Sequence, residues 1–157
     1  MNRKWQVLFL VLSLLCALFI FSNSMVAEKK MSTRESGILK AVENVINHYT
    51  THSVHLDTKT AHTRLAKLAH LGEFAVFSAL FTTAVFAFWK ETRPHFLKIL
   101  FVGVFCAVTD EHLQLVTDGR SSRVSDVMID LCGVLIGYAI ASGLLRLIQK
   151  RKEKKNA

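Results

Sequence analysis

Residues that could do chemistry stand inside apolar stretches of this sequence. They gather near one end of each stretch: Lys67, His70 and Glu73 near the start of 66–89, Asp110, Glu111 and Gln114 near the end of 96–116, and Asp126 and Asp130 near the start of 124–148. Ionisable groups are costly inside a bilayer and mark functional sites there by default. A histidine beside paired carboxylates could do acid–base chemistry, and carboxylates could hold a divalent cation through oxygen ligands.

The elements that must position these residues are four apolar stretches, at 5–25, 66–89, 96–116 and 124–148. Each is close to the length of about 20 residues that a helix needs to cross the hydrocarbon core of a bilayer. In hydrocarbon only helices and closed barrels satisfy their own backbone groups, and the sequence shows no alternating barrel pattern. The prediction is an all-α membrane protein, a bundle of four transmembrane helices that forms a single domain over residues 1–157.

The composition argues against several other classes of protein. The chain has 157 residues, of which 51% are hydrophobic, and a formal net charge of +8. This hydrophobic content argues against disorder, and basic residues flanking apolar blocks favour a membrane protein over a soluble nucleic-acid binder. Cys16, Cys106 and Cys132 lie in apolar stretches without a CxxC pair, which predicts buried thiols and neither a disulfide nor a zinc finger.

The distribution of Lys and Arg predicts the orientation of the bundle. The N-terminus, the linker 90–98 and the tail 149–157 are basic, and all three fall on one side of a four-span protein. By the positive-inside rule this side is cytoplasmic, so both termini are expected there. The residues that could do chemistry then collect within about two helical turns of the external face, although they are scattered in the sequence.

The first apolar stretch has an alternative interpretation as a cleaved signal peptide. Ser22-Asn23-Ser24 offers small residues at a suitable spacing for cleavage, although the stretch is long for the apolar region of a signal peptide. Cleavage would leave the orientation of the other three spans unchanged.

The segment between the first two spans predicts a short external amphipathic helix. Ser32-x-x-Glu35 is a capping-box pattern, and apolar residues recur at helical spacing from Ile38 to Tyr49. Such a helix either caps the bundle or binds a partner. His48 and His52 have the spacing of two metal ligands on one helix face, but nothing nearby completes a site, so no metal ligand is predicted here. The sequence does not specify a cofactor.

Helical periodicity places acidic residues on the same faces as small residues. Two stripes result, one of Asp126, Asp130, Gly133 and Gly137 and one of Gly103, Ala107, Asp110 and Gln114. We expect these stripes to face each other, because a Gly-x-x-x-Gly pattern lets helices approach closely. Carboxylates gathered in one place repel unless they are paired, and Arg120 and Arg123, on the short loop that Gly119 can turn, are the expected partners.

The polar pattern resembles the VanZ-like family of bacterial membrane proteins. The resemblance covers residues 67–137 and is carried by Lys67-x-x-His70-x-x-Glu73-Phe74, Asp110-Glu111-x-x-Gln114, Gly119-Arg120 and Asp126-x-x-x-Asp130-x-x-Gly133-x-x-x-Gly137. Phe74 stands where the family usually has Tyr, Asp118 where it often has Pro, and Asp130 where it commonly has Asn. The resemblance implies a multi-pass protein of the bacterial cell membrane and a link to low-level resistance to the glycopeptide teicoplanin.

Two classes of function remain open. The first is an envelope protein without catalytic activity, whose outward-facing polar pocket binds a lipid headgroup, a cell-wall precursor or a lipophilic glycopeptide. The second is a small membrane enzyme, a hydrolase or transferase, that acts on a lipid-linked substrate at the outer leaflet. A transporter is a third option and would require an oligomer, since four spans show no inverted repeat. Membrane lipids are expected partners in each case, and nucleic acid is not.

Overall fold

The computed structural model describes residues 3–26, 58–90, 95–118 and 123–156, together with scattered residues between 37 and 48. These ranges contain four helices and no strand: α1 (Arg3–Ser24), α3 (Thr58–Trp89), α4 (Phe96–Leu115) and α5 (Val124–Asn156). The all-helical prediction is therefore confirmed for the described residues. The capping box at Ser32 and Glu35, most of the expected amphipathic helix, and His52 lie outside them.

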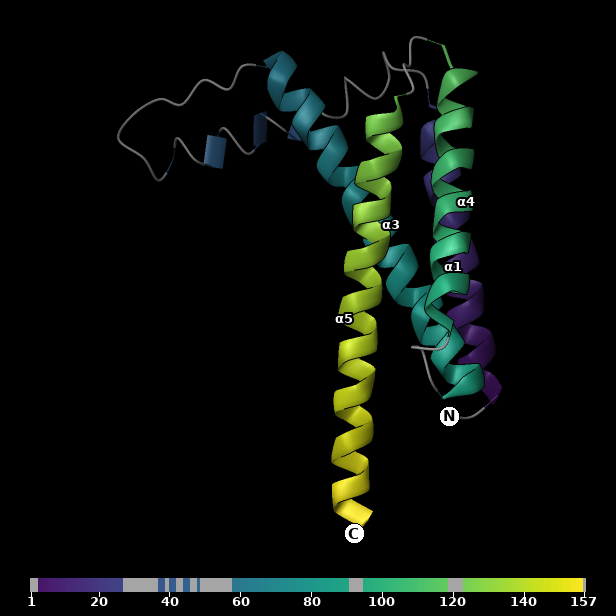
Figure 1. Cartoon of the computed structure of the whole chain (residues 1–157). Helices are drawn as coiled ribbons and strands as arrows, with labels where there is room; N and C mark the ends of the chain where they lie inside the picture. The colour runs from purple at the N-terminus through teal and green to yellow at the C-terminus, as the bar shows by residue number, and fades with distance from the viewer. Residues whose placement is uncertain are drawn as a thin grey trace.

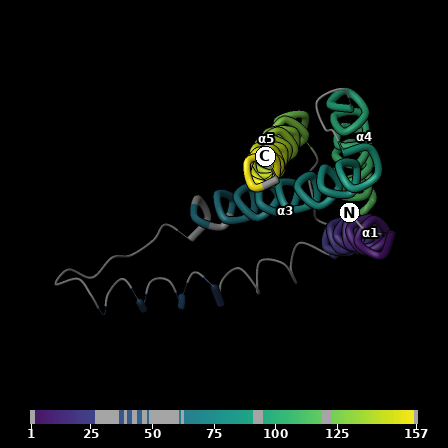
Figure 2. Tube along the Cα trace, turned by 90° about the horizontal axis from the view of Figure 1, so that it is seen from below, coloured from purple at the N-terminus to yellow at the C-terminus, as the bar shows by residue number. Residues whose placement is uncertain are grey.

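Helices α1 and α4 run in one direction along the bundle, and α3 and α5 run in the opposite direction (Figure 1). The C-terminal ends of α1 and α4 lie at the same end as the N-terminal parts of α3 and α5, and both chain termini lie at the other end. Helix α3 runs between α5 and α1, while α4 packs against α5 and α1 (Figure 2). Each of the four helices therefore packs against at least two of the others.

Two of the helices are longer than the apolar stretches predict. Helix α3 begins at Thr58 rather than near residue 66, and α5 continues beyond Ile148 to Asn156. The extension of α5 consists mostly of Lys, Arg, Glu and Gln, which are good helix formers in water. Residues 149–156 of the expected basic tail therefore form a helical projection of α5 from the bundle.

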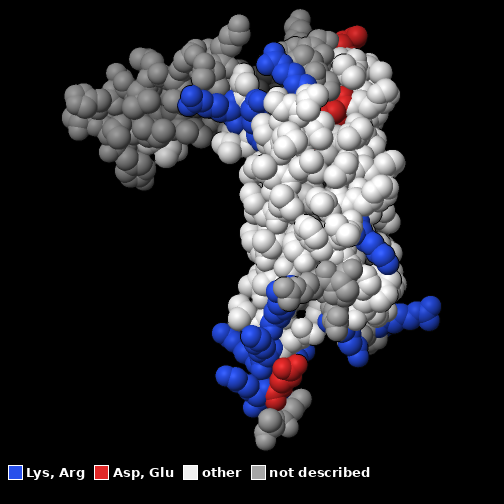
Figure 3. Space-filling view, in the orientation of Figure 1, with Lys and Arg blue, Asp and Glu red and all other residues white. Residues whose placement is uncertain are grey.

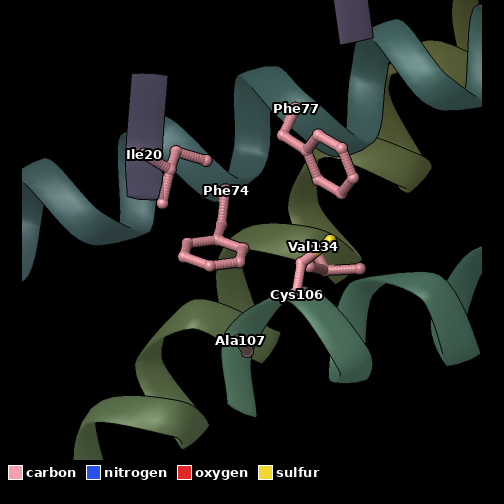
Figure 4. Close-up of a cluster of buried hydrophobic side chains, with 6 residues drawn as sticks. All are labelled: Ile20, Phe74, Phe77, Cys106, Ala107 and Val134. Atoms are coloured by element: carbon pink, nitrogen blue, oxygen red, sulfur yellow. The ribbon is translucent and has the colours of Figure 1, made fainter. Parts of the chain in front are cut away.

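The core draws on all four helices (Figure 4). Its buried members are Ile20 from α1, Phe74 and Phe77 from α3, Cys106 and Ala107 from α4, and Val134 from α5. Phe74 has no exposed surface, and its ring is surrounded by apolar side chains. A hydroxyl group at this position would need a partner in the core, which explains why Phe suits this chain.

The glycines of α5 pack against α3, which corrects the expectation that they face α4. A Cβ atom built on Gly133 would clash with the carbonyl oxygen of Leu71 and lie 3.0 Å from the Cβ of Phe74. A Cβ on Gly137 would clash with the carbonyl of Ala75. Helix α3 accepts this close approach because Ala75 and Ala79 are small, and the two-stripe expectation overlooked them.

The stripe of small and polar residues on α4 that begins at Gly103 packs against a different face of α5, the face that carries Val134. A Cβ atom on Gly103 would lie 2.6 Å from Cγ1 of Val134, the residue that follows Gly133. Helix α5 therefore presents one face to α3 through its glycines and an adjacent face to α4 through Val134. A hydrogen bond of 2.7 Å from Ser78 Oγ to the carbonyl oxygen of Val134 joins α3 to the same point.

Three of the described helices are long and apolar enough to cross a membrane: Arg3–Ser24, the Thr63–Trp89 part of α3 and the Val124–Lys155 part of α5. Many large apolar side chains on the outer surface of the bundle are exposed, as suits helices surrounded by lipid. Helix α4 has the necessary 20 residues. It also contains Lys98, Asp110 and Glu111, more charge than a helix surrounded by lipid on all sides tolerates.

Candidate functional site at the polar end of the bundle

Each of the four helices contributes a polar side chain to one buried cluster. We call the end of the bundle that holds it the polar end, and the end that holds the chain termini the basic end. The cluster consists of Ser24 at the end of α1, His70 on α3, Asp110 on α4 and Asp130 on α5. Both aspartates have no exposed surface, and the His70 side chain is 19% exposed.

His70 lies between the two aspartates. Its Nδ1 atom is 3.6 Å from Oδ2 of Asp110 and 3.6 Å from Oδ1 of Asp130. Both distances exceed the usual range for a hydrogen bond from nitrogen to oxygen. Among the described residues Nδ1 has no hydrogen-bond partner. The three side chains offer one ligand atom each, all within 4.8 Å of one another, so they could hold a metal ion.

Asp110 is held in place by two donors. Ser24 Oγ donates a hydrogen bond of 2.5 Å to Oδ1, and Gln114 Nε2 donates one of 2.8 Å to Oδ2. Gln114 lies one turn after Asp110 on the same face of α4, and its Nε2 also reaches Ser24 Oγ at 3.5 Å. The carboxylate of Asp110 is therefore oriented by both its own helix and α1.

Asp130 is in the opposite situation. Neither of its carboxylate oxygens has a hydrogen-bond partner among the described residues, although the side chain is fully buried. Asp110, Glu111, Asp126 and Glu73 are close enough to repel a negative charge there. A buried carboxylate without a partner is destabilising by several kcal/mol, of the order of 3–5 when a pair is broken. A buried carboxylate of this kind therefore has to be neutralised, either by a proton or by a cation.

Two further carboxylates line the same end and have partners. Asn23 Nδ2 donates a hydrogen bond of 3.0 Å to Oε1 of Glu73. The backbone N–H of Arg123 donates one of 3.1 Å to Oε2 of Glu111, whereas Oε1 of Glu111 is buried and has no hydrogen-bond partner among the described residues. The contribution of Arg123 thus comes from its backbone, whereas the sequence suggested its guanidinium.

The counterion of Asp126 is a lysine from another helix. Lys67 Nζ lies 3.0 Å from Oδ1 of Asp126, and Ser125 Oγ donates a second hydrogen bond of 3.2 Å to this oxygen. Both charged side chains are partly exposed, at 39% and 26%. The sequence analysis assigned the acidic residues to arginines of the 117–125 loop. Arg120, the expected central counterion, lies outside the described residues together with Gly119.

Asn23 and Ser24 are the site residues that sequence reasoning missed. They were interpreted only as part of a cleavage site, whereas both donate hydrogen bonds to carboxylates of the cluster. Cleavage at this position would remove both donors, together with Ile20 from the core. The sequence feature that identifies them is their position at the end of the first span. With alternating span directions, this end lies at the same level of the bundle as the other polar residues.

An all-helical bundle with apolar outer faces and a buried polar cluster at one end defines a small integral membrane protein. The family model VanZ/LLP1 matches residues 7–147, which is most of the chain, and the chain therefore belongs to this family. The match includes the whole of α3 and α4, most of α1 and α5, and the polar residues described above. No curated protein and no solved structure matches the chain.

Proposed function

We propose that this chain is a multi-pass protein of the bacterial cell membrane, with four spans and with the polar end facing outward. The charge distribution supports this orientation. Figure 3 shows basic side chains gathered at the basic end, a largely uncharged band above them, and a smaller group of basic side chains at the polar end. Arg146, Lys150 and Arg151 belong to this end and are exposed. Positive charge concentrated at one end of a bundle favours the cytoplasmic side for that end.

In this proposal α4 also crosses the membrane, in addition to the three helices identified above as long and apolar enough to do so. Its charged groups near the polar end, Asp110 and Glu111, are buried against the other helices and do not face lipid. Its outward-facing residues are large and apolar, for example Phe101 and Phe105, which are strongly exposed. Lys98 is exposed near the start of α4, where a long side chain can reach the headgroup region. A helix of about 20 residues with these faces fits a bilayer.

The function that this geometry supports best is recognition of a membrane-resident amphiphile by its polar head. The observation that carries the proposal is the convergence of carboxylates from three helices at one end of an apolar bundle. Carboxylate oxygens accept hydrogen bonds from ammonium, hydroxyl and amide groups, and Lys67 offers a cation for phosphate. Lipid headgroups, cell-wall precursors and lipophilic glycopeptides such as teicoplanin carry such groups. A role in teicoplanin-type resistance follows from binding of this kind.

Native mass spectrometry of the full chain, purified from bacterial membranes, tests this proposal. We expect a stoichiometric lipid or lipid-linked precursor on the wild type and much less on Glu111→Gln, which alters a buried carboxyl with one unpartnered oxygen. Asp118→Asn is the matched control, because Asp118 is exposed. Teicoplanin susceptibility of cells expressing each variant at equal levels gives the second readout. The proposal fails if the wild type retains no amphiphile, or if Glu111→Gln equals the wild type in both measurements.

A second candidate function is an enzyme that acts on the same kind of ligand. The observation that favours it is His70, 3.6 Å from each of two carboxylates, an arrangement suited to moving protons. Purified protein would be incubated with the amphiphile that it retains, and the products would be analysed by mass spectrometry. Cleavage by the wild type and none by His70→Gln would establish catalysis. Retention of intact amphiphile by the wild type would leave binding as the function.

A further inference from the structure

We propose that His70, Asp110 and Asp130 form a binding site for one divalent transition-metal ion, with Mn²⁺ and Zn²⁺ as the best-matched metals. The three side chains come from α3, α4 and α5, so such an ion would join three helices at the polar end. The site rests on the positions of these atoms and does not depend on which amphiphile the polar end binds.

The spacing of the ligand atoms fits one shared ion. Two ligands at about 2.1 Å from a metal lie roughly 3.0–3.5 Å apart when the angle between them is tetrahedral or octahedral. The two measured separations, from His70 Nδ1 to an oxygen of each aspartate, are 3.6 Å. All three ligand atoms lie within 4.8 Å of one another, so one shared ion would require side-chain rotations that draw them closer together. The same separations are too long for direct hydrogen bonds.

The unpartnered carboxylate of Asp130 is the independent observation that points to a ligand. Its side chain is completely buried, and neither oxygen has a hydrogen-bond partner among the described residues. A proton would remove the negative charge of Asp130 alone and would leave the carboxylate of Asp110 charged beside it. A cation neutralises Asp130 and Asp110 together and also uses the free lone pair of His70 Nδ1. It therefore satisfies charge and coordination at once.

Asp110 has the surroundings of a metal ligand. Carboxylates that bind metals are themselves held by hydrogen bonds from outer groups, which fix their orientation. Ser24 and Gln114 hold Asp110 in this way, with hydrogen bonds of 2.5 and 2.8 Å. Its Oδ2 still faces His70 at 3.6 Å.

The donor set selects among the metals. One imidazole nitrogen and two carboxylate oxygens suit Mn²⁺ or Zn²⁺, whereas Mg²⁺ prefers oxygen ligands and retains several waters. Three protein ligands leave at least one coordination position open, as in sites that bind water or a substrate oxygen. His70 is the partly exposed member of the three, so an incoming group would approach from its side.

Metal binding to the purified full chain tests the proposal. The protein would be stripped with a chelator and titrated with Mn²⁺, Zn²⁺ and Mg²⁺ by isothermal calorimetry, with elemental analysis of the bound ion. We expect one Mn²⁺ or Zn²⁺ per chain, weak or no Mg²⁺ binding, and a metal-dependent rise in melting temperature. Asp130→Asn should bind at least about tenfold more weakly, since even loss of an outer-shell partner costs roughly 10–100-fold.

Asp118→Asn is the matched control, because Asp118 is exposed and is not among the carboxylates that act on Asp130. It should bind metal as the wild type does. His70→Gln gives a second ligand variant in case Asp130→Asn fails to fold. The proposal is overturned if the wild type binds no ion, or if both ligand variants bind as tightly as the wild type. Retained amphiphile without metal would overturn the metal site alone, and metal without amphiphile would overturn only the proposed headgroup recognition.

Discussion

At the residue scale, the contact between Ser24 and Asp110 shows how the end of one helix completes a site on another. Ser24 is buried and donates to a fully buried carboxylate, while Ser22, two residues earlier, is exposed. The two serines have the same chemistry and differ in what surrounds them. Their comparison therefore isolates the value of one hydrogen bond.

Ser24→Ala should destabilise the protein, because it leaves an oxygen of Asp110 buried without its donor. The expected cost is about 1–3 kcal/mol, the usual penalty for an unsatisfied buried group. Ser22→Ala should change stability by less than about 0.5 kcal/mol. Thermal unfolding of both variants in the same detergent measures the difference. Equal melting temperatures for Ser24→Ala and the wild type would show that this hydrogen bond does not stabilise the folded bundle.

The ion pair between Lys67 and Asp126 should contribute little, despite its short distance of 3.0 Å. Both side chains are partly exposed, and water weakens exposed ion pairs to about 0–1 kcal/mol. A double-mutant cycle with Lys67→Ala and Asp126→Ala should give a coupling energy below about 1 kcal/mol that falls further at high salt. A coupling of several kcal/mol, unchanged by salt, would mean that the pair is shielded from water in the membrane.

The depth of the site residues could be predicted from the sequence, whereas their partners could not. Helical rise and alternating span direction place His70, Asp110 and Asp130 at one level, and the structure brings these three together. Pairing depends in addition on how far each helix is rotated about its axis. Lys67 reaches Asp126 because α3 packs against α5, and sequence periodicity does not specify that neighbour.

At the element scale, the contact between α3 and α5 depends on two glycines. The groups that a Cβ on Gly137 would meet are backbone atoms of Ala75 and Ala79, which cannot rotate away as a side chain could. Gly143 lies on the same helix, and a Cβ atom there would meet nothing within 4 Å. These two glycines form a matched pair for testing close approach.

Gly137→Ala should lower the stability of the bundle, because overpacking a tight contact costs typically about 1–3 kcal/mol. Gly143→Ala should be neutral or slightly stabilising, since Ala is the better helix former. The yield of folded protein by fluorescence-detected size exclusion, followed by thermal unfolding, compares the two. A Gly137→Ala variant as stable as Gly143→Ala would mean that α3 and α5 are farther apart than the structure shows.

The Gly-x-x-x-Gly pattern predicts a close helix contact but not the partner helix. The acidic stripe of 96–116 suggested that this partner would be α4, and it is α3. The small residues Ala75 and Ala79 on α3 are spaced four apart, like Gly133 and Gly137 on α5, and this matching spacing is the sequence feature that distinguishes the correct pairing. Acidic residues on two helices can share a site without those helices making the closest contact.

At the scale of the whole molecule, the two ends of the bundle differ in the chemistry that they present. At the basic end, Gln6 Nε2 and Gln149 Nε2 donate hydrogen bonds to the carbonyls of Ala87 and Lys90, at 2.8 and 3.0 Å. These bonds satisfy carbonyl groups that the end of α3 leaves free. The polar end instead retains carboxylate oxygens without partners. Among the described residues, the buried side-chain atoms without a hydrogen-bond partner belong to His70, Glu111 and Asp130 at the polar end, apart from Oγ1 of Thr82.

The proposed orientation of the bundle, with the polar end outward, gives the last prediction. Single cysteines would be introduced at Asp118, which is exposed at the polar end, and at Arg151, which is exposed at the basic end. Cys16, Cys106 and Cys132 would first be replaced by serine or alanine, so that no native thiol reacts. An impermeant maleimide applied to intact cells should label the cysteine at 118 and spare the one at 151, and both should react after the membrane is opened. Basic flanks are retained on the cytoplasmic side, which protects position 151 in intact cells. Labelling at 151 without labelling at 118 would place the carboxylate cluster on the cytoplasmic side, where it could not meet a ligand arriving from the cell exterior.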